Sequence, residues 1–382
     1  MMMSNKTYLF ITTTVLSLLL LAAGCAKSAK QTTTTEQKVV KAVETKVEPE
    51  KVVETKVGPE KTVETKVEPE KTVETKVEPD ERKPAATLAL KFEPNDVSTY
   101  KVTMEAEKSV IWEGPKPSKP SAFKGGSTSN RSEMTFTQQI KSIDDDGNAT
   151  AAITIKKLKF LAKVRDDIVI DFDSSREKDK NDPMNALIGQ SYSVKITPAG
   201  RVATVIDARE PQTAVKGSST AARTARALLG AEVVKQRHSM PALPPSDKNR
   251  VSKGDTWSAL KTFNFTLLGV KSYERIYELK EVRDSDKGKV AVAQMNGVPS
   301  SEKATELHKE QSTGFLSKLF DNTEEYTGRL ELDLAAGKVN KYTEKLKSEW
   351  LAVDPESVQN DDKEPAALRM TALRFYEIER TD

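Results

Sequence analysis

The segment Tyr100–Trp112 reads YKVTMEAEKSVIW and alternates between apolar and polar side chains. Apolar residues hold every second position from its first residue to its last, with Lys108 as the single exception. A period of two is the repeat of a β-strand that buries one face. The segment therefore predicts a long strand, half buried, with one cation on its apolar face.

The same alternation continues on both sides of an acidic turn. It runs through Met134–Ile140, stops at Asp144–Asn148 (DDDGN) and resumes at Ala151–Ile155. Beyond Lys156–Lys157 the apolar positions move by one residue and then recur through Leu158–Val164. A shift of one residue would turn the buried face outward, so we predict a β-bulge at the two lysines.

A second series of strand patterns repeats this order. The turn Asp284–Gly288 parallels the first acidic turn, and the turn Ala335–Lys338 parallels Ala199–Arg201. The glycines of the two turns are 53 residues apart in the first series and 49 in the second. A helical insert near Phe315–Phe320 corresponds to a short helix near Pro183–Ile188. The matched turns predict two copies of one β-meander unit.

A helix is predicted between the two copies, over Ala221–Arg237. Its apolar stripe has helical spacing and consists of Ala222, Ala225, Leu229 and Val233, while the basic residues lie mainly elsewhere. We expect this helix to cover one face of a sheet. The alternative is a basic surface for an acidic polymer or for lipid headgroups. The prolines Pro241, Pro244 and Pro245 then mark the boundary before the second copy.

The C-terminal run Leu368–Ile378 fits two structures. Pro365 could begin a helix, but the alternating apolar residues favour a strand that rejoins the sheet. The predicted fold class is thus α+β, mainly antiparallel β. It has one β-rich unit with a helix at 84–240, a second unit at 241–382, and a disordered linker at 25–83 in front of them.

The linker contains four decapeptides in register over residues 41–80, each built like KTVETKVEPE. Valine is the main apolar residue, and a proline recurs every ten residues at Pro49, Pro59, Pro69 and Pro79. Proline blocks a continuous helix, and so little apolar surface cannot offset the entropy of ordering the chain. We expect a solvated spacer, up to about 130 Å long if fully extended. The alternative is that it binds peptidoglycan or a partner strand.

The N-terminal segment contains one cation, Lys6, and then a short apolar run, Leu9–Leu21, which leads into Leu21–Cys25 (LAAGC). The run is too short and too early for a transmembrane helix. It resembles the bacterial lipoprotein signal, with Ala22 where leucine is usual. That resemblance implies a signal peptide at 1–24, cleavage after Gly24, and lipid on the sulfur of Cys25. The alternative is an ordinary secretory peptide.

The same resemblance implies a location and a partner. A lipidated Cys25 would hold the protein on a membrane, and Ala26, in place of an aspartate, favours the outer membrane of the cell envelope. The formal charge of +3 gives no argument for nucleic-acid binding.

Motifs for chemistry are weak throughout the sequence. One cysteine and two distant histidines argue against a zinc site. A calcium loop that begins at Ser142 would place Ile153 where a bidentate carboxylate is required. Gly189–Ser193 lacks the last glycine of a nucleophile elbow. We therefore assign no catalytic residue, no metal ligand and no cofactor.

The body from Leu88 onward loosely resembles uncharacterised bacterial envelope proteins with β-meanders and Gly-Lys/Arg-Val hairpins. A more distant similarity is to lipoprotein carriers in which a curved antiparallel sheet and a covering helix enclose acyl chains. We expect a non-enzymatic module that binds an apolar or amphiphilic ligand, or an envelope partner, on a bent sheet. The alternatives are a structural adaptor in the envelope and, with less support, an envelope hydrolase.

Overall fold

The computed structural model describes residues 85–114, 125–265, 270–286, 288–300, 321–353 and 366–382. All of them belong to one compact unit of the chain. The predicted signal peptide, Gly24, Cys25, the decapeptide spacer and the insert at 315–320 lie outside the described residues.

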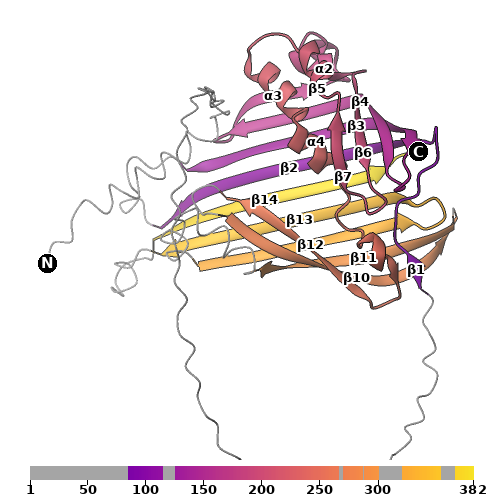
Figure 1. Ribbon diagram of the computed structural model, residues 1–382. Helices are drawn as coiled ribbons and strands as arrows, with labels where there is room; N and C mark the ends of the chain where they lie inside the picture. The colour runs from indigo at the N-terminus through magenta and orange to yellow at the C-terminus, as the bar shows by residue number, and fades with distance from the viewer. Residues whose placement is uncertain (1–84, 115–124, 266–269, 287, 301–320, 354–365) are drawn as a thin grey trace, which may run out of the picture. The chain divides into compact units, whose positions relative to one another are not determined.

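One twelve-stranded antiparallel sheet dominates the described chain (Figure 1), which confirms the mainly antiparallel β class. Its order is β7-β6-β4-β3-β2-β14-β13-β12-β11-β10-β9, and β5 also pairs with β4. Its first strands are β2 Val97–Glu113, β3 Gly126–Ile143, β4 Ala149–Val164, β5 Asp167–Asp173, β6 Ser191–Ile196 and β7 Val202–Ile206. The later strands are β9 Thr256–Asn264, β10 Val270–Ser285, β11 Gly288–Ser300, β12 Asp321–Asp333, β13 Lys338–Val353 and β14 Ala367–Arg380.

The C-terminal run is strand β14, so the strand interpretation is correct and the helix interpretation is wrong. It lies between β13 and β2, with Tyr342 opposite Ile378 and Ile378 opposite Val102. The first and last long strands of the described chain are therefore neighbours at the middle of the sheet. A separate small sheet pairs β1 (Ala86–Thr87) with β8 (Arg250–Val251).

The predicted bulge in β4 is confirmed. Thr135 is opposite Lys157 and Phe136 is opposite Ile155, so Lys156 is the extra residue. The bulge returns Leu158 to the buried face, where Ile155 and Leu158 are both fully buried. Without the bulge, the shift of one residue in the sequence pattern would have turned the apolar residues after Lys157 toward solvent.

The predicted single helix over 221–237 is wrong in its continuity. The structure has α3 Thr220–Leu228 and α4 Ala231–His238, preceded by α2 Arg209–Ala214. Gly230 interrupts the helical hydrogen bonding, because its amide bonds the carbonyl of Ala227 while its own extended backbone starts α4. The break also shifts the apolar stripe, so Val234 is buried in place of Val233.

The described residues also form three short 3-10 helices: η2 Glu177–Asp179, η3 Pro183–Leu187 and η4 Ser246–Lys248. The short helix expected at 183–188 is η3. Asp182 caps it, because its carboxylate accepts from the amide of Met184 at 2.8 Å.

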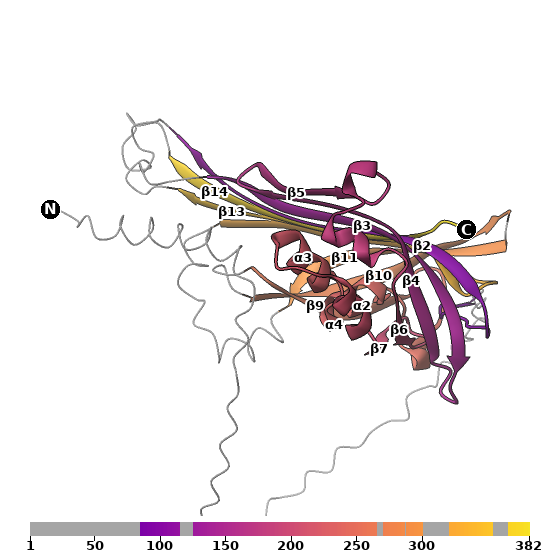
Figure 2. The same cartoon turned by 90° about the horizontal axis from the view of Figure 1, so that it is seen from above.

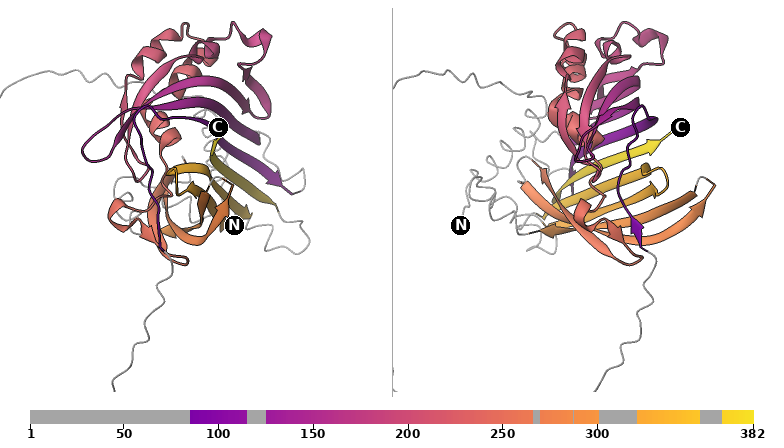
Figure 3. Two further views of the ribbon diagram at one scale, coloured as in Figure 1. Left: turned by 90° about the vertical axis from the view of Figure 1, so that its right-hand side faces the viewer. Right: turned by 45° about the vertical axis from the view of Figure 1, so that its right-hand side comes forward.

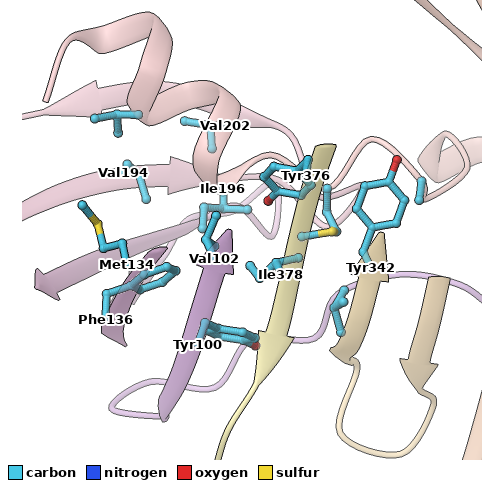
Figure 4. Packing of buried hydrophobic residues seen from close by; sticks show 14 of the residues in the cluster. Tyr100, Val102, Met134, Phe136, Val194, Ile196, Val202, Tyr342, Tyr376 and Ile378 are labelled. Carbon is cyan, nitrogen blue, oxygen red and sulfur yellow. The ribbon is translucent and has the colours of Figure 1, made fainter. Parts of the chain in front are cut away.

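Helices α2–α4 cover one face of the sheet, here called the inner face (Figure 2). Figure 4 shows Tyr100 and Val102 from β2, Phe136 from β3, and Tyr376 and Ile378 from β14 gathered on this face. All five are buried. The apolar alternation predicted from Tyr100 onward therefore points to the main core.

A segment in front of β2, residues 88–92, links turns from both halves of the sheet. The Leu90 amide donates to the Pro198 carbonyl at 2.8 Å, and the Lys91 amide donates to the Gly337 carbonyl at 3.0 Å. Gly200 and Gly337 both have positive φ, which glycine adopts without strain. The β6–β7 and β12–β13 turns are thus held by one stretch of chain, which we call the strap.

In the C-terminal half the sheet bends back over its own inner face (Figure 3, orange strands). Two interior contacts show this bend. Arg275 on β10 reaches Glu344 on β13, although β11 and β12 lie between these strands in the sheet. Phe265, just after β9, packs edge-on against Trp350 on β13 with ring centroids 5.2 Å apart.

Candidate functional site

The helix-covered part of the inner face contains one buried polar group of residues. Tyr192 and the Nε2 atom of His238 share a hydrogen bond of 2.7 Å, and Arg237 donates to the Tyr192 hydroxyl at 3.3 Å. Arg237 also donates to the Leu228 carbonyl at 2.7 Å, and Tyr376 donates to the Arg237 carbonyl at 2.8 Å. These bonds tie α3, α4, β6 and β14 together. Arg237, expected on the polar side of the helix, is fully buried.

His238 belongs to the core. Burial, and then the neighbouring Arg237 charge, lower its pKa well below the usual value, so the ring is neutral near pH 7. Its edge packs against Phe136 with ring centroids 4.6 Å apart. No carboxylate and no serine or cysteine nucleophile is hydrogen-bonded to it among the described residues. We therefore assign His238 a structural role.

A second polar group fills the bend of the C-terminal half. Glu344 accepts from Tyr326 at 2.5 Å, from Tyr342 at 2.7 Å and from Arg275 at 3.2 Å. Tyr342 also shares a 3.2 Å hydrogen bond with the hydroxyl of Tyr277. We call these five residues the Glu344 network. Burial raises the pKa of both Tyr326 and Tyr342, so their hydroxyls stay protonated and donate.

A second carboxylate in the bend is held in the same way. Glu324 accepts from Lys271 at 2.6 Å and from Tyr273 at 2.7 Å. Burial alone would raise the pKa of Glu324, but these hydrogen bonds lower it below its usual value. Glu324 therefore stays ionised, and both carboxylates of the bend are paired with a cation, which is the arrangement that a stable buried charge requires.

The third region of the inner face is the C-terminal part of β2, after Val102. Tyr100 and Val102 are buried, whereas the next inner-facing residues are only half-buried. These five residues, which we call the inner row, are Met104, Ala106, Lys108, Val110 and Trp112. Opposite them on β14, Leu368, Met370 and Ala372 provide a buried apolar floor.

Two cations lie side by side on this apolar surface. Lys108 is opposite Ala372 and Arg374 is opposite Ala106, so the two are diagonal neighbours on the inner face. Burial lowers the pKa of Arg374, while burial and then the Arg374 charge lower that of Lys108. Arg374 makes no hydrogen bond or ion pair within the part of the chain that the structure describes. We call Lys108 and Arg374 the cation pair.

An open cavity of about 550 Å³ lies at the β7 edge of the sheet, between β7 and α2. Its lining mixes apolar and charged residues, including Val205, Asp207, Arg209 and Glu210. Asp207 has a φ of +58°, which is an uncommon conformation for a residue other than glycine. The lining contains no serine, cysteine, threonine, lysine or histidine side chain, so we give this cavity no chemical assignment.

The acidic turn predicted at 144–148 is a hairpin turn between β3 and β4. Asp144 accepts from the amides of Asp146 and Asn148 and pairs with Lys195 at 2.6 Å. Hydrogen bonds from Lys195 and then Asn148 lower the pKa of Asp144 to about 2. Its oxygens therefore already have partners.

The described residues show neither a metal-binding cluster nor a membrane-spanning helix. They contain no group of three or more histidine, cysteine, aspartate or glutamate side chains placed to hold a metal ion. None of their helices is long and apolar enough to cross a membrane.

The sequence identified only part of the inner row. Lys108 stood out as the exception in the alternation of Tyr100–Trp112. Arg374 did not, because its segment fitted either a helix or a strand, and only a strand paired with β2 places it beside Lys108. The Glu344 network could not be found, since no periodicity brings β10, β12 and β13 together.

Comparison with known proteins gives no family. No family model and no curated protein matches this chain. Among solved structures, a chain described as "lipid-protein interactions in lipovitellin" is similar over 76% of this chain, with 9% identity and a TM-score of 0.34. The match spans 26% of the lipovitellin chain. DynF from the dynemicin biosynthesis pathway of Micromonospora chersina is 7% identical over 80% of this chain and 92% of its own, with a TM-score of 0.13. At these scores neither likeness supports a functional argument.

Proposed function

We propose that this protein is a lipid-anchored, non-enzymatic module of the bacterial cell envelope, and that its inner row binds an apolar or amphiphilic ligand. The observation that carries the proposal is the change along β2 from buried to half-buried apolar side chains. The residues before this change are sealed by the helices. Those after it keep apolar surface that a ligand can cover.

The size of the inner row suits a long alkyl chain. Met104 to Trp112 span about 26 Å at roughly 3.3 Å per residue. Each methylene that such a chain buries contributes about 0.8 kcal/mol. A few methylenes in contact with the row and with the β14 floor would therefore give a useful affinity, and the neighbouring cations would orient a polar end.

Trp112 offers a direct test of this binding. A fatty acid brominated along its chain should quench part of the tryptophan fluorescence of the purified full-length protein, because bromine would come to rest beside the indole. The Trp112→Phe variant should lose most of that quenching, while Trp257 stays as an internal reference in the buried bend. Equal quenching of the parent and the variant, or no saturable quenching of either, would show that the inner row is not the site.

The anchor is proposed from the LAAGC stretch at Leu21–Cys25. Cleavage after Gly24 would expose Cys25 for lipidation, and acyl chains on that residue would hold the protein on the outer membrane. The spacer would place the folded body away from the lipid headgroups. A Cys25→Ala variant should move to the soluble fraction on cell fractionation, and membrane retention of that variant would contradict the anchor.

We also propose that the sheet contains two copies of one unit, at 84–240 and 241–382. The strands matched by the sequence have matching neighbours, because β3-β4-β6-β7 and β10-β11-β12-β13 are each contiguous in the sheet. The β6–β7 and β12–β13 turns are each followed by a register shift, and in each the extra residue is the third one after the glycine of the turn. These residues are Ala203 after Gly200 and Asn340 after Gly337. A shared irregularity at the same position supports a common unit more than shared turns do.

A further inference from the structure

We propose that the ligand of the inner row is an anionic amphiphile whose charged headgroup is bound by Arg374 together with Lys108. This inference rests on the proposed binding of an amphiphile to the inner row. It adds the chemical class of the headgroup and the residues that select it.

The positions opposite Arg374 carry no charge to balance its guanidinium. Arg374 lies between Ala106 on β2 and Leu346 on β13, and both of these residues are uncharged.

The nearest inner-facing carboxylate in register is already occupied. Glu344 is two residues from Leu346 on β13 and directly opposite Tyr376. Its two oxygens accept from Tyr326, Tyr342 and Arg275. The Glu344 network thus neutralises its own cation, Arg275, and the described residues supply no other carboxylate that pairs with the Arg374 guanidinium.

A partly buried guanidinium without a counterion is costly, and a bound anion removes that cost. The planar guanidinium can donate two parallel hydrogen bonds to a carboxylate or a phosphate. The second positive charge, on Lys108, adds attraction for an anion and repulsion for a cation. The apolar row beside both cations would hold the alkyl chain, so the two parts of an anionic amphiphile match adjacent parts of the surface.

The test compares ligands that share one alkyl chain and differ in the headgroup. Palmitate, hexadecyl phosphate, hexadecanol and hexadecylamine would each displace a fluorescent fatty acid from the purified full-length protein. We expect the two anions to bind at least tenfold more tightly than the alcohol, and the amine to bind most weakly. Preference for the phosphate over palmitate would indicate a phospholipid-type headgroup, and the opposite preference a free fatty acid.

Two variants connect the preference to the cation pair. Arg374→Gln and Lys108→Met should each reduce the ratio of alcohol to palmitate dissociation constants at least threefold, with the larger loss in Arg374→Gln. Lys345→Gln is the matched control, because Lys345 is an exposed cation on the outer face of β13. It should keep the parent ratio. Thermal unfolding followed by circular dichroism would verify that each variant is folded, and the Lys108 variant provides the test if Arg374→Gln does not fold.

The outcomes separate this inference from the proposed function. If the alcohol and palmitate bind the parent protein with equal affinity, the headgroup inference is overturned and the binding of an amphiphile stands. If none of the four compounds displaces the probe, the proposed function itself is overturned. A preference for anions that survives in both folded variants would assign the headgroup to other residues and so also overturn the inference.

Discussion

The two halves of the sheet cover their inner faces in different ways. In the first half a layer of helices covers the strands, and the core between them is mostly apolar, with His238 neutral beside Phe136 and Tyr192. In the second half the sheet bends back on itself, and the space inside the bend holds Arg275 and Glu344. A helix layer can supply apolar side chains at any depth. A bent sheet must fill its interior with its own inward side chains, and hydroxyls and charges there need partners.

The largest effect is expected in the second half, from Glu344→Leu. This change leaves the Arg275 guanidinium, which is 3% exposed, without its carboxylate. Breaking one partner of a buried ion pair costs about 3–5 kcal/mol of unfolding free energy. Urea unfolding of the full-length protein would measure the loss.

The double variant Arg275→Met with Glu344→Leu is the matched control. Replacing both charges by apolar groups of similar size removes the unpaired guanidinium, so the double variant should recover most of the lost stability. If it is no more stable than Glu344→Leu alone, the cost lies in the tyrosine contacts and the charge argument for the bend is wrong.

An intermediate effect is expected at the two equivalent turns. In Gly337→Ala the added Cβ would lie 2.5 Å from the Lys91 amide nitrogen in the strap, and in Gly200→Ala it would lie 2.8 Å from the Met240 carbonyl oxygen. Both glycines also have positive φ. Each substitution should cost roughly 1–3 kcal/mol in urea unfolding, from backbone strain and displacement of the neighbouring chain.

Gly254→Ala separates these two causes. Gly254 has a φ of +92°, and a Cβ there would meet no atom within 4 Å. It should therefore show the conformational cost alone and lose less stability than either turn variant. Equal losses at all three glycines would mean that the close approach of the strap and of Met240 contributes nothing.

The smallest expected effect is a pH dependence of stability, and it comes from His238 in the first half of the sheet. His238 has a pKa lowered by burial and by Arg237, so the unfolded chain binds a proton below about pH 6.5 that the folded protein excludes. The unfolding free energy is therefore highest above this pH and falls as the pH drops toward the pKa of His238 in the folded protein. This one group changes the unfolding free energy by at most about 1.4 kcal/mol per pH unit.

Unfolding free energies between pH 7.5 and 5.5 would measure this slope. His238→Gln should flatten it, because the variant has no imidazole to protonate on unfolding. The Glu344→Leu variant should keep the parent slope, since its change lies in the other half. An unchanged slope in His238→Gln would show that His238 is not responsible for the pH dependence.

Local patterns predicted the strands well because they depend on local physics. The alternation of Tyr100–Trp112 gave β2, and the shift after Lys156 gave the bulge, since the choice of buried face follows a period of two. Alternation identifies a strand's face but not its neighbours. The pairing of β2 with β14 therefore had to come from the structure.

The errors have one origin. The sequence places the basic residues of 221–237 mainly away from the apolar stripe, yet contacts from β6 and β14 bury Arg237. The predicted helix at 221–237 failed at Gly230, where one residue without a side chain allows a turn that the apolar stripe does not reveal. The burial of a side chain and the curvature of a sheet depend on contacts between distant segments, and the candidate site depends on both.

The central place of β14 has a consequence for how the protein is made. This strand follows all the others in the sequence, yet it completes the hydrogen bonding of both β2 and β13. Until it is synthesised, each half ends in an unpaired strand edge that can join the edge of another chain. Pairing over so long a separation also slows folding. A chain interrupted before residue 367 would therefore remain open at its middle, with the edges of β2 and β13 unpaired.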